Sequence, residues 1–282
     1  MSVVWGIPYL LIKVAVRHLD PALIVEGRTA IAAVVLLPLA YRRRQLRPLL
    51  SAWKPLLAYT VVEMAIPWYL LPEAERRLPS SLTGLLVATV PLIAVLLAAL
   101  TGHRDRVDRR RLSGLVVGLI GVGILLGLDV THGDLRSVGY VLLVALGYAT
   151  GPLLAAHYFE HLSSLALSAV SVTVVAVAYL PLAVARAPAQ PPPGTVIASV
   201  IALGTVCTAL AFVAFFELIK EVGSTRATVI TYVNPAVAVV LGVAFLGESF
   251  TLATGIGFLL ILAGSWLSTA TARRTRLSQS AS

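Results

Sequence analysis

The sequence predicts an all-α integral membrane protein with ten transmembrane helices, arranged as two inverted repeats of five helices. Three observations support this prediction. The chain has 282 residues, of which 58% are hydrophobic and only 12% are charged, whereas a soluble domain carries roughly 25% charged residues. The apolar residues form ten stretches close to the length that crosses a bilayer. Several prolines and other turn-forming residues also recur at one fixed offset along the chain.

Short polar gaps separate these apolar stretches and leave no room for a soluble domain. We expect spans at 3–16, 22–41, 55–72, 82–100, 112–128, 138–156, 163–184, 195–218, 226–246 and 251–271. The first five spans form one repeat over residues 1–130, and the other five form a second repeat over 137–271. A basic cytoplasmic tail follows at 272–282.

The first stretch is short for a span, because Lys13 and Arg17 already occupy its far end. A spanning helix needs about 20 apolar residues. Either this helix is tilted in a thin part of the membrane or the native chain begins upstream of Met1, and we favour the second explanation.

Arginine and lysine gather in alternate loops. The loops at 42–47 and 104–111 are strongly basic, whereas those at 129–136 and 186–194 carry one arginine each. Because basic loops stay in the cytoplasm, both termini are expected there. Lysine is scarce beside arginine and alanine, which is typical of a GC-rich bacterial genome and suggests the inner membrane. The basic residues lie between membrane spans, so nucleic-acid binding is not expected.

A shift of 144 residues superposes turn-forming residues of the two halves: Pro8 with Pro152, Ser80 with Ser224, and Pro91 with Pro235. Five helices per repeat is an odd number, so the second repeat must be inverted in the membrane. Inverted repeats can exchange conformations around one central site, as transporters do. Pro67, Pro91 and Pro235 are expected to kink their helices near that centre, although each could merely bend a helix around its neighbours.

The order and spacing of several short motifs are similar to those of one family over nearly the whole chain. The motifs are Trp5-Gly6, Lys13, Arg28, Ala65-Ile66-Pro67, Ala74-Glu75-Arg76-Arg77, Val90-Pro91-Leu92, Leu203-Gly204-Thr205, Phe216-Glu217-Leu218, Tyr232-Val233-Asn234-Pro235, Leu246-Gly247-Glu248-Ser249 and Ala263-Gly264. The chain resembles the EamA family of the drug/metabolite transporter superfamily. The resemblance implies ten helices and secondary transport of small metabolites, commonly amino acids or related compounds. One departure is Thr101-Gly102-His103-Arg104, which replaces the first-repeat Leu-Gly-Glu element.

Glu63 is the most prominent candidate for a functional residue, because an ionisable group within a span is costly and needs a partner or a purpose. Tyr59 and Pro67 lie four residues to either side, so the three share one helical face. Glu63 could bind a substrate ammonium or exchange a coupling proton. It could instead form a structural pair with Arg28 or a hydrogen bond to a neighbouring helix.

Arg28 could receive a substrate carboxylate, or it could tie helix ends together. Glu26 lies near the outer end of the same helix and is expected to be solvated, and Lys13 is close enough to the interface to extend towards water.

Aromatic and amide side chains complete the predicted pathway. Tyr232 and Asn234 precede Pro235, where unwound backbone would suit a polar substrate. Trp5, Tyr9, Trp68 and Tyr148 could line the pathway or could serve as packing and interface residues.

No cofactor or metal is expected. His157 and His161 have helical spacing but no third ligand in view, and the single cysteine, Cys207, lies in an apolar run. A face of small residues on the fifth helix could pack within the chain or form a homodimer contact. This face consists of Gly114, Gly118, Gly121 and Gly123, with Gly127 beyond.

We expect a secondary transporter that exports a small organic metabolite, with that substrate, the lipid bilayer and coupling protons as its partners. No nucleotide-binding motif is present. A membrane-embedded enzyme would need clustered catalytic residues, which the spans lack. A membrane component that binds or senses without transport would gain nothing from inverted repeats.

Overall fold

The computed structural model describes residues 1–43, 46–100, 109–129, 135–222 and 233–269. Every regular element in these ranges is helical, and none is a β-strand. The α-helices are α1 (Ser2–Ala15), α2 (Pro21–Arg42), α3 (Arg47–Ser51), α4 (Trp53–Thr60), α5 (Ile66–Glu75), α6 (Ser80–Val87), α7 (Val90–Leu100), α8 (Arg109–Asp129), α9 (Leu135–Phe159), α10 (Ser164–Ala185), α11 (Gly194–Gly204), α12 (Ala211–Val222), α14 (Asn234–Leu246) and α15 (Leu252–Thr269). Two π-helical segments, η1 (Val61–Ala65) and η3 (Thr205–Leu210), join α4 to α5 and α11 to α12.

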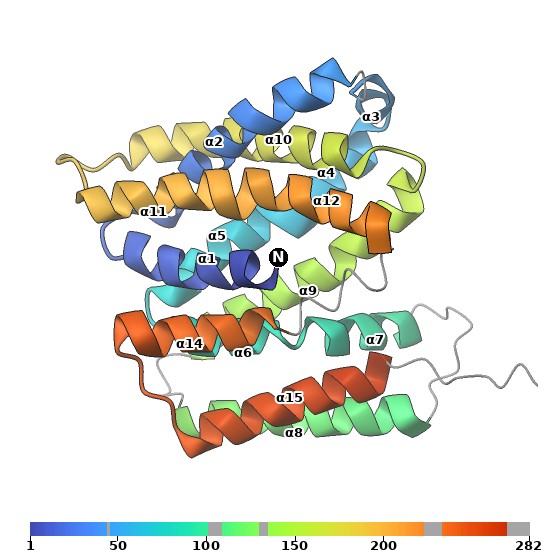
Figure 1. Cartoon of the computed structure of the whole chain (residues 1–282), viewed down its shortest axis with the longest axis vertical. Coiled ribbons are helices and arrows are strands. Elements are labelled where there is room, and N and C mark those ends of the chain that lie inside the picture. The colour runs from blue at the N-terminus through green and yellow to red at the C-terminus, as the bar shows by residue number, and fades with distance from the viewer. Residues whose placement is uncertain (44–45, 101–108, 130–134, 223–232, 270–282) are drawn as a thin grey trace, which may run out of the picture.

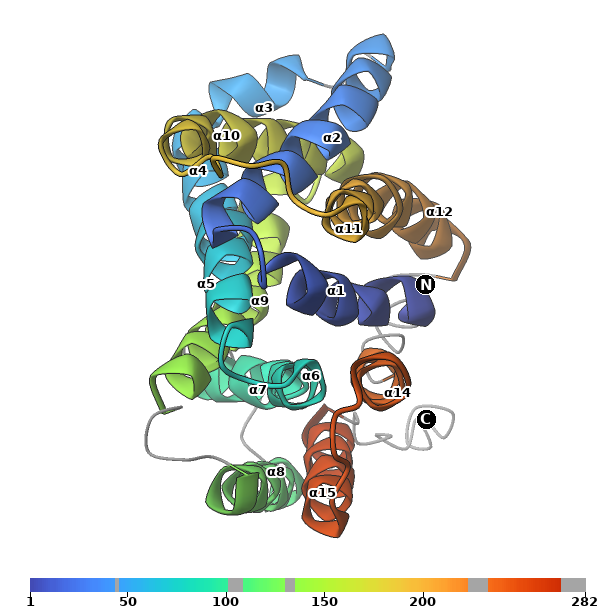
Figure 2. The same ribbon diagram turned by 90° about the vertical axis from the view of Figure 1, so that its left-hand side faces the viewer.

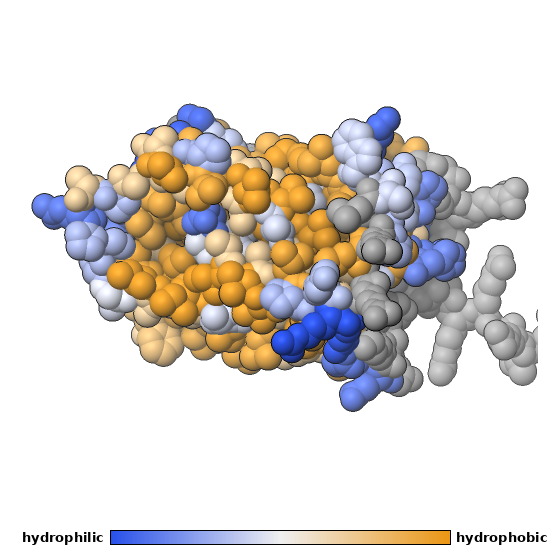
Figure 3. Space-filling view, turned by 90° about the horizontal axis from the view of Figure 1, so that it is seen from above, coloured by the Kyte–Doolittle hydropathy of each residue, from blue (hydrophilic) through white to orange (hydrophobic). Residues whose placement is uncertain are grey.

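Among the described residues, six helical stretches are long and apolar enough to cross a membrane, and α1 and α14 are shorter apolar helices. The chain is therefore a multi-pass α-helical membrane protein. Figure 3 agrees, because hydrophobic side chains cover most of the middle of the face it shows and hydrophilic ones gather towards both ends. α1 has 14 residues, about 21 Å at 1.5 Å per residue, and covers only part of the bundle length in Figure 1.

The helices lie roughly side by side, from α2 and α10 at one edge of the bundle to α8 and α15 at the other (Figures 1 and 2). α2 packs on α10, α6 on α14, and α8 on α15. Each of these pairs joins a helix from the first half of the chain to one from the second half. α1 lies between α11 and α14 and contacts both, so the N-terminal helix is in the middle of the bundle.

Four turns lie together at one end of the bundle, at residues 16–20, 76–79, 186–193 and 247–251 (left in Figure 1). We call this the Asp20 end and the opposite end the Arg42 end. The Asp20 carboxylate accepts the Ala22 N–H at the start of α2 and forms ion pairs with Arg76 at 3.2 Å and Arg186 at 2.9 Å. Asp20 thus connects three of the four turns.

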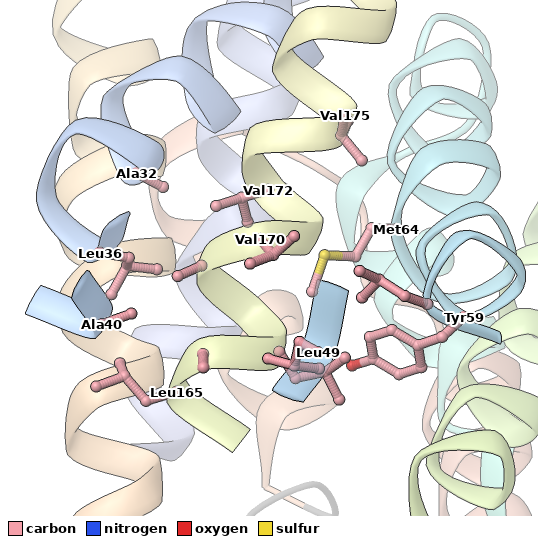
Figure 4. Packing of buried hydrophobic residues seen from close by; sticks show 14 of the residues in the cluster. Ala32, Leu36, Ala40, Leu49, Tyr59, Met64, Leu165, Val170, Val172 and Val175 are labelled. Atoms are coloured by element: carbon pink, nitrogen blue, oxygen red, sulfur yellow. The ribbon is translucent and has the colours of Figure 1, made fainter. Parts of the chain in front are cut away.

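Small residues let α2 and α10 approach closely. Ala32, Leu36 and Ala40 of α2 lie opposite Val170 and Val172 of α10 in one buried cluster (Figure 4). Alanines leave room for the neighbouring backbone where no larger side chain would fit.

The two π segments begin 144 residues apart, at Val61 and Thr205, the offset at which the prolines recur. η1 ends just before Pro67. A proline lacks the N–H that would bond four residues back, and its ring crowds that carbonyl, so a wider turn relieves the clash. The span 80–100 is likewise interrupted between Val87 and Val90, directly before Pro91.

The glycines of the predicted fifth span lie on α8. Two of them pack against another helix of the same chain. A Cβ atom on Gly121 would lie 2.7 Å from the main-chain oxygen of Gly257, and one on Gly114 would lie 2.7 Å from that of Gly264. α8 and α15 therefore meet backbone to backbone. A Cβ atom on Gly123 would meet nothing within 4 Å, and Gly127 lies outside the residues whose side chains are described.

We predict that Gly121→Ala destabilises the protein because its methyl group forces α8 and α15 apart. Overpacking of this kind costs about 1–3 kcal/mol, which should lower the melting temperature in detergent. Gly123→Ala is the matched control on the same helix and should leave the melting temperature unchanged or slightly raised. Equal melting temperatures for the two variants would refute the close contact.

Candidate functional site

Arg28 is a buried cation in the first half of α2, with only 9% of its surface exposed. Its Nε–H donates to Oγ1 of Thr208 at 2.8 Å, and its guanidinium carbon lies 3.8 Å from the centre of the Trp68 ring. A hydroxyl group and an aromatic face stabilise a cation but do not neutralise it. In the described part of the chain no carboxylate forms an ion pair with Arg28.

Thr208 belongs to the π segment η3. Its hydroxyl donates to the main-chain oxygen of Leu203, five residues earlier, at 2.7 Å and therefore accepts from Arg28. α2 reaches this segment because Gly204 has no side chain. A Cβ atom there would lie 2.6 Å from Cβ of Ile31 and 3.0 Å from the main-chain oxygen of Arg28. Arg28, which belongs to α2, thus contacts η3 through Thr208 and α5 through Trp68.

Glu63 belongs to the other π segment, η1, and faces α9. Its carboxyl group lies against Gly151, where any Cβ atom would collide with it. Its Oε2 atom is buried and has no hydrogen-bond partner among the described residues. No ion pair joins Glu63 to Arg28 there, so the structural pair considered from the sequence is not formed in this structure.

Tyr59 and Pro67 point towards the same helix as Glu63. The Tyr59 ring lies edge-on to Phe159 of α9, with ring centres 6.2 Å apart. A Cβ atom on Gly147 of α9 would lie 2.9 Å from Cγ of Pro67. The three residues therefore line one contact, between the η1 region and α9.

Two tyrosines lie near these charged residues. Tyr148 of α9 interacts electrostatically with both Arg28 and Glu63. Tyr9 of α1 interacts with Arg28 and Tyr148 and is buried in the cluster that also holds Ala238 of α14. The centre of the bundle thus offers one cation and one carboxyl group, with tyrosine side chains near them.

The remaining predicted residues lie around this centre. The Trp5 ring lies 4.7 Å from that of Phe215 in α12. Asn234 begins α14 next to α1, because a Cβ atom on Gly6 would lie 2.9 Å from the main-chain oxygen of Asn234. Pro235 is buried, and Tyr232 lies outside the described residues.

Pro91 is away from the centre. It lines a surface pocket of about 270 Å³ between α7 and the ends of α8 and α15. A larger cavity of about 430 Å³ opens at the Arg42 end, lined by Arg43, His161, Ser163, Phe216 and Glu217 among others.

In the described part of the chain, no group of three His, Cys, Asp or Glu side chains could hold a metal ion. His157 and His161 are exposed on α9 and the turn that follows it. Cys207, by contrast, is buried beside the Arg28 site in η3.

Sequence reasoning missed Thr208, which accepts a hydrogen bond from Arg28, and Gly151, which leaves space for the Glu63 carboxyl group. Neither belongs to a motif that signals its role. For Gly151, the adjoining Pro152 was the available signal, because it matches Pro8 in the repeat alignment.

Comparison with known proteins identifies the family. The model of the EamA-like transporter family matches twice, over residues 1–127 and 135–270. The chain belongs to the EamA-like transporter family.

Several curated relatives cover most of the chain. An uncharacterized inner membrane transporter of Escherichia coli is 26% identical over 89% of this chain and 82% of its own length. A probable terminal-alkyne amino-acid exporter of Streptantibioticus cattleyicolor is 27% identical over 87% and 83%. A probable amino-acid metabolite efflux pump of Salmonella typhimurium is 22% identical over 94% and 91%.

A solved crystal structure has the same fold, with a TM-score of 0.68 over 95% of this chain and 93% of the other, at 20% identity.

We predict that Thr208→Val lowers the melting temperature of the protein in detergent, because it removes the hydroxyl that accepts the Arg28 Nε–H. A hydrogen bond to a charged group contributes about 1.5–3 kcal/mol. Thr205→Val, in the same π segment, removes a hydroxyl that donates to the main-chain oxygen of Ile201, and it should cost less. If the two variants lose the same stability, Thr208 does not hold Arg28 as described.

Proposed function

We propose that this EamA-family protein is a secondary transporter that exports a small zwitterionic metabolite, such as an amino acid or a related compound, by alternating access. One observation carries the proposal. The buried Arg28 guanidinium group, which donates to η3, and the carboxyl group of Glu63 in η1, whose Oε2 atom is buried, do not pair with each other. Arg28 would bind the substrate carboxylate, and Glu63 its ammonium group.

The membrane arrangement proposed is ten spans in two inverted repeats, 1–130 and 137–271, with a cytoplasmic tail at 272–282. In support, the family model matches each half once, and the π segments begin 144 residues apart. An odd number of spans per repeat inverts the second copy, so two like units can open the central site to either side in turn.

The location proposed is the bacterial inner membrane, with both termini in the cytoplasm. Arg42 and Arg43 at the end of α2 and Arg110 and Arg111 at the start of α8 lie at the Arg42 end, and basic residues favour the cytoplasmic side. The Asp20 end then faces outwards.

The relatives support export of an amino-acid-like substrate, because two of them are named as a probable amino-acid exporter and a probable amino-acid metabolite efflux pump. The polarity of the centre agrees with these names. A substrate with both charges could replace water at Arg28 and Glu63 together, whereas an apolar drug would leave both groups unpaired.

Export of a metabolite panel from cells tests the proposal. Cells that produce the wild-type protein should export one or more amino acids or related zwitterions. Glu63→Gln should reduce that export about tenfold or more, because it removes a charged hydrogen bond contributing about 1.5–3 kcal/mol. Glu26→Gln, a neutralisation near the outer end of α2, is the matched control and should export as the wild type does.

Unchanged export by Glu63→Gln would remove Glu63 from the site. If cells that produce the protein export no more of any zwitterion than cells with the empty vector, the proposed substrate class is wrong.

A further inference from the structure

A second buried carboxyl group lies at the Asp20 end of the bundle. Glu75 is the last residue of α5 and is completely buried. Neither of its carboxyl oxygens has a hydrogen-bond partner among the described residues. The transport site described above does not use Glu75, so its burial needs a separate explanation.

Lys13 approaches Glu75 without pairing with its carboxyl group. The Lys13 Nζ donates to the main-chain oxygens of Glu75 at 2.6 Å and Leu78 at 2.8 Å. The ammonium group thus satisfies carbonyls at the end of α5 and in the turn that follows. Lys13 therefore lies next to Glu75, although its ammonium group contacts the main chain and not the carboxyl group.

Glu248 makes the next connection across the two halves of the chain. Its carboxylate accepts the N–H groups of Ser80 at 2.6 Å and Ser81 at 2.9 Å, the first residues of α6. Gly247 reverses the chain after α14 with a φ of 66°. Gly242 leaves room for the Glu248 carboxylate, with which a Cβ atom there would collide. We call the contact of Glu248 with Ser80 and Ser81 the Glu248 latch.

The charges of this cluster balance only when Glu75 is neutral. Glu75 interacts electrostatically with Lys13, Glu248 and Tyr9. One ammonium group and one carboxylate already cancel. An ionised Glu75 would add an uncompensated charge in a site with no donor for its oxygens, which is strongly unfavourable.

The arginines around this cluster are exposed to solvent, and we leave them out of its charge balance. Arg17 interacts with Lys13 but is itself exposed. Arg76 and Arg77 follow Glu75 directly and are also exposed, with Arg76 paired to Asp20 and Glu73.

We propose that Glu75 is a proton-binding site that controls whether the Asp20 end is open or closed. With the proton bound, Lys13 stays on the main-chain carbonyls and the Glu248 latch is closed, as in this structure. When the O–H bond of Glu75 breaks, the proton passes to water at the Asp20 end. Lys13 then moves to the new carboxylate and no longer balances the charge of Glu248, so the latch opens.

The link from this switch to substrate movement rests on the proposed transport function, but proton binding itself can be measured without a substrate. Hydrogen–deuterium exchange of the peptide that contains Ser80 and Ser81 reports the latch directly, because Glu248 accepts both amide hydrogens. The purified full-length protein in detergent is compared with Glu75→Gln, which cannot lose a proton, over a series from neutral to alkaline pH. Comparison at equal pH cancels the intrinsic pH dependence of exchange.

The wild-type peptide should exchange about fivefold or more faster than that of Glu75→Gln at alkaline pH and at the same rate near neutral pH. Glu73→Gln is the matched control on the same helix and should follow the wild type, whereas Glu248→Gln should exchange fast at every pH. If Glu75→Gln does not fold, Glu75→Leu takes its place with the same expected result.

Equal exchange in the wild type and the Glu75 variant at every pH would overturn the proposal, as would a Glu73→Gln protein that behaves like Glu75→Gln. Failure of the export assay would leave this result untouched, so the two proposals fail separately.

Discussion

The Arg28 guanidinium group is buried in the centre of a membrane protein, where no carboxylate of the described residues forms an ion pair with it, and the surrounding structure is arranged around this constraint. A charged side chain at the centre of a bilayer costs about 2.5–3.5 kcal/mol or more. Here that cost is offset only in part, by one hydrogen bond from Arg28 to Thr208 and by the face of Trp68. Because the positive charge of Arg28 is compensated only in part, an anionic group of a substrate could pair with it in the proposed site. In the proposed site, Glu63, whose Oε2 atom has no partner among the described residues, binds the other end of the same ligand.

The two π segments place these groups. In a π turn the i to i+4 bonding of the helix is interrupted, which allows side chains and backbone polar groups to serve a site instead of the helix. Glycines then bring neighbouring helices close enough to complete it, since Gly204 admits α2 to η3 and Gly151 admits Glu63 to α9. The two halves of the chain thus contribute to the centre in different ways. The segment η1 carries Glu63, whereas η3 supplies Thr208, which accepts a hydrogen bond from Arg28.

The sequence was informative wherever local composition decides the outcome. Where the structure describes the expected ranges they are largely helical, because apolar length and loop residues determine them, and the burial of the Glu63 Oε2 atom follows from its apolar neighbours. The contact between Arg28 and Thr208 could not be predicted, because it joins residues 180 positions apart and threonine is common in membrane helices. The glycine face of α8 was visible, but its partner was not, because small residues suit an internal and an intermolecular contact equally well. Tyr232 remains a prediction.

Ligand-induced thermal stabilisation of the purified protein tests the central claim most directly. A zwitterionic amino acid found in the export assay is compared with its amide, which lacks the carboxylate, and its N-acetyl derivative, which lacks the ammonium group. The account predicts that only the zwitterion raises the melting temperature, and that Arg28→Lys and Glu63→Gln each abolish the effect. Equal stabilisation by all three compounds, or undiminished stabilisation of both variants, would show that Arg28 and Glu63 do not bind a substrate between them.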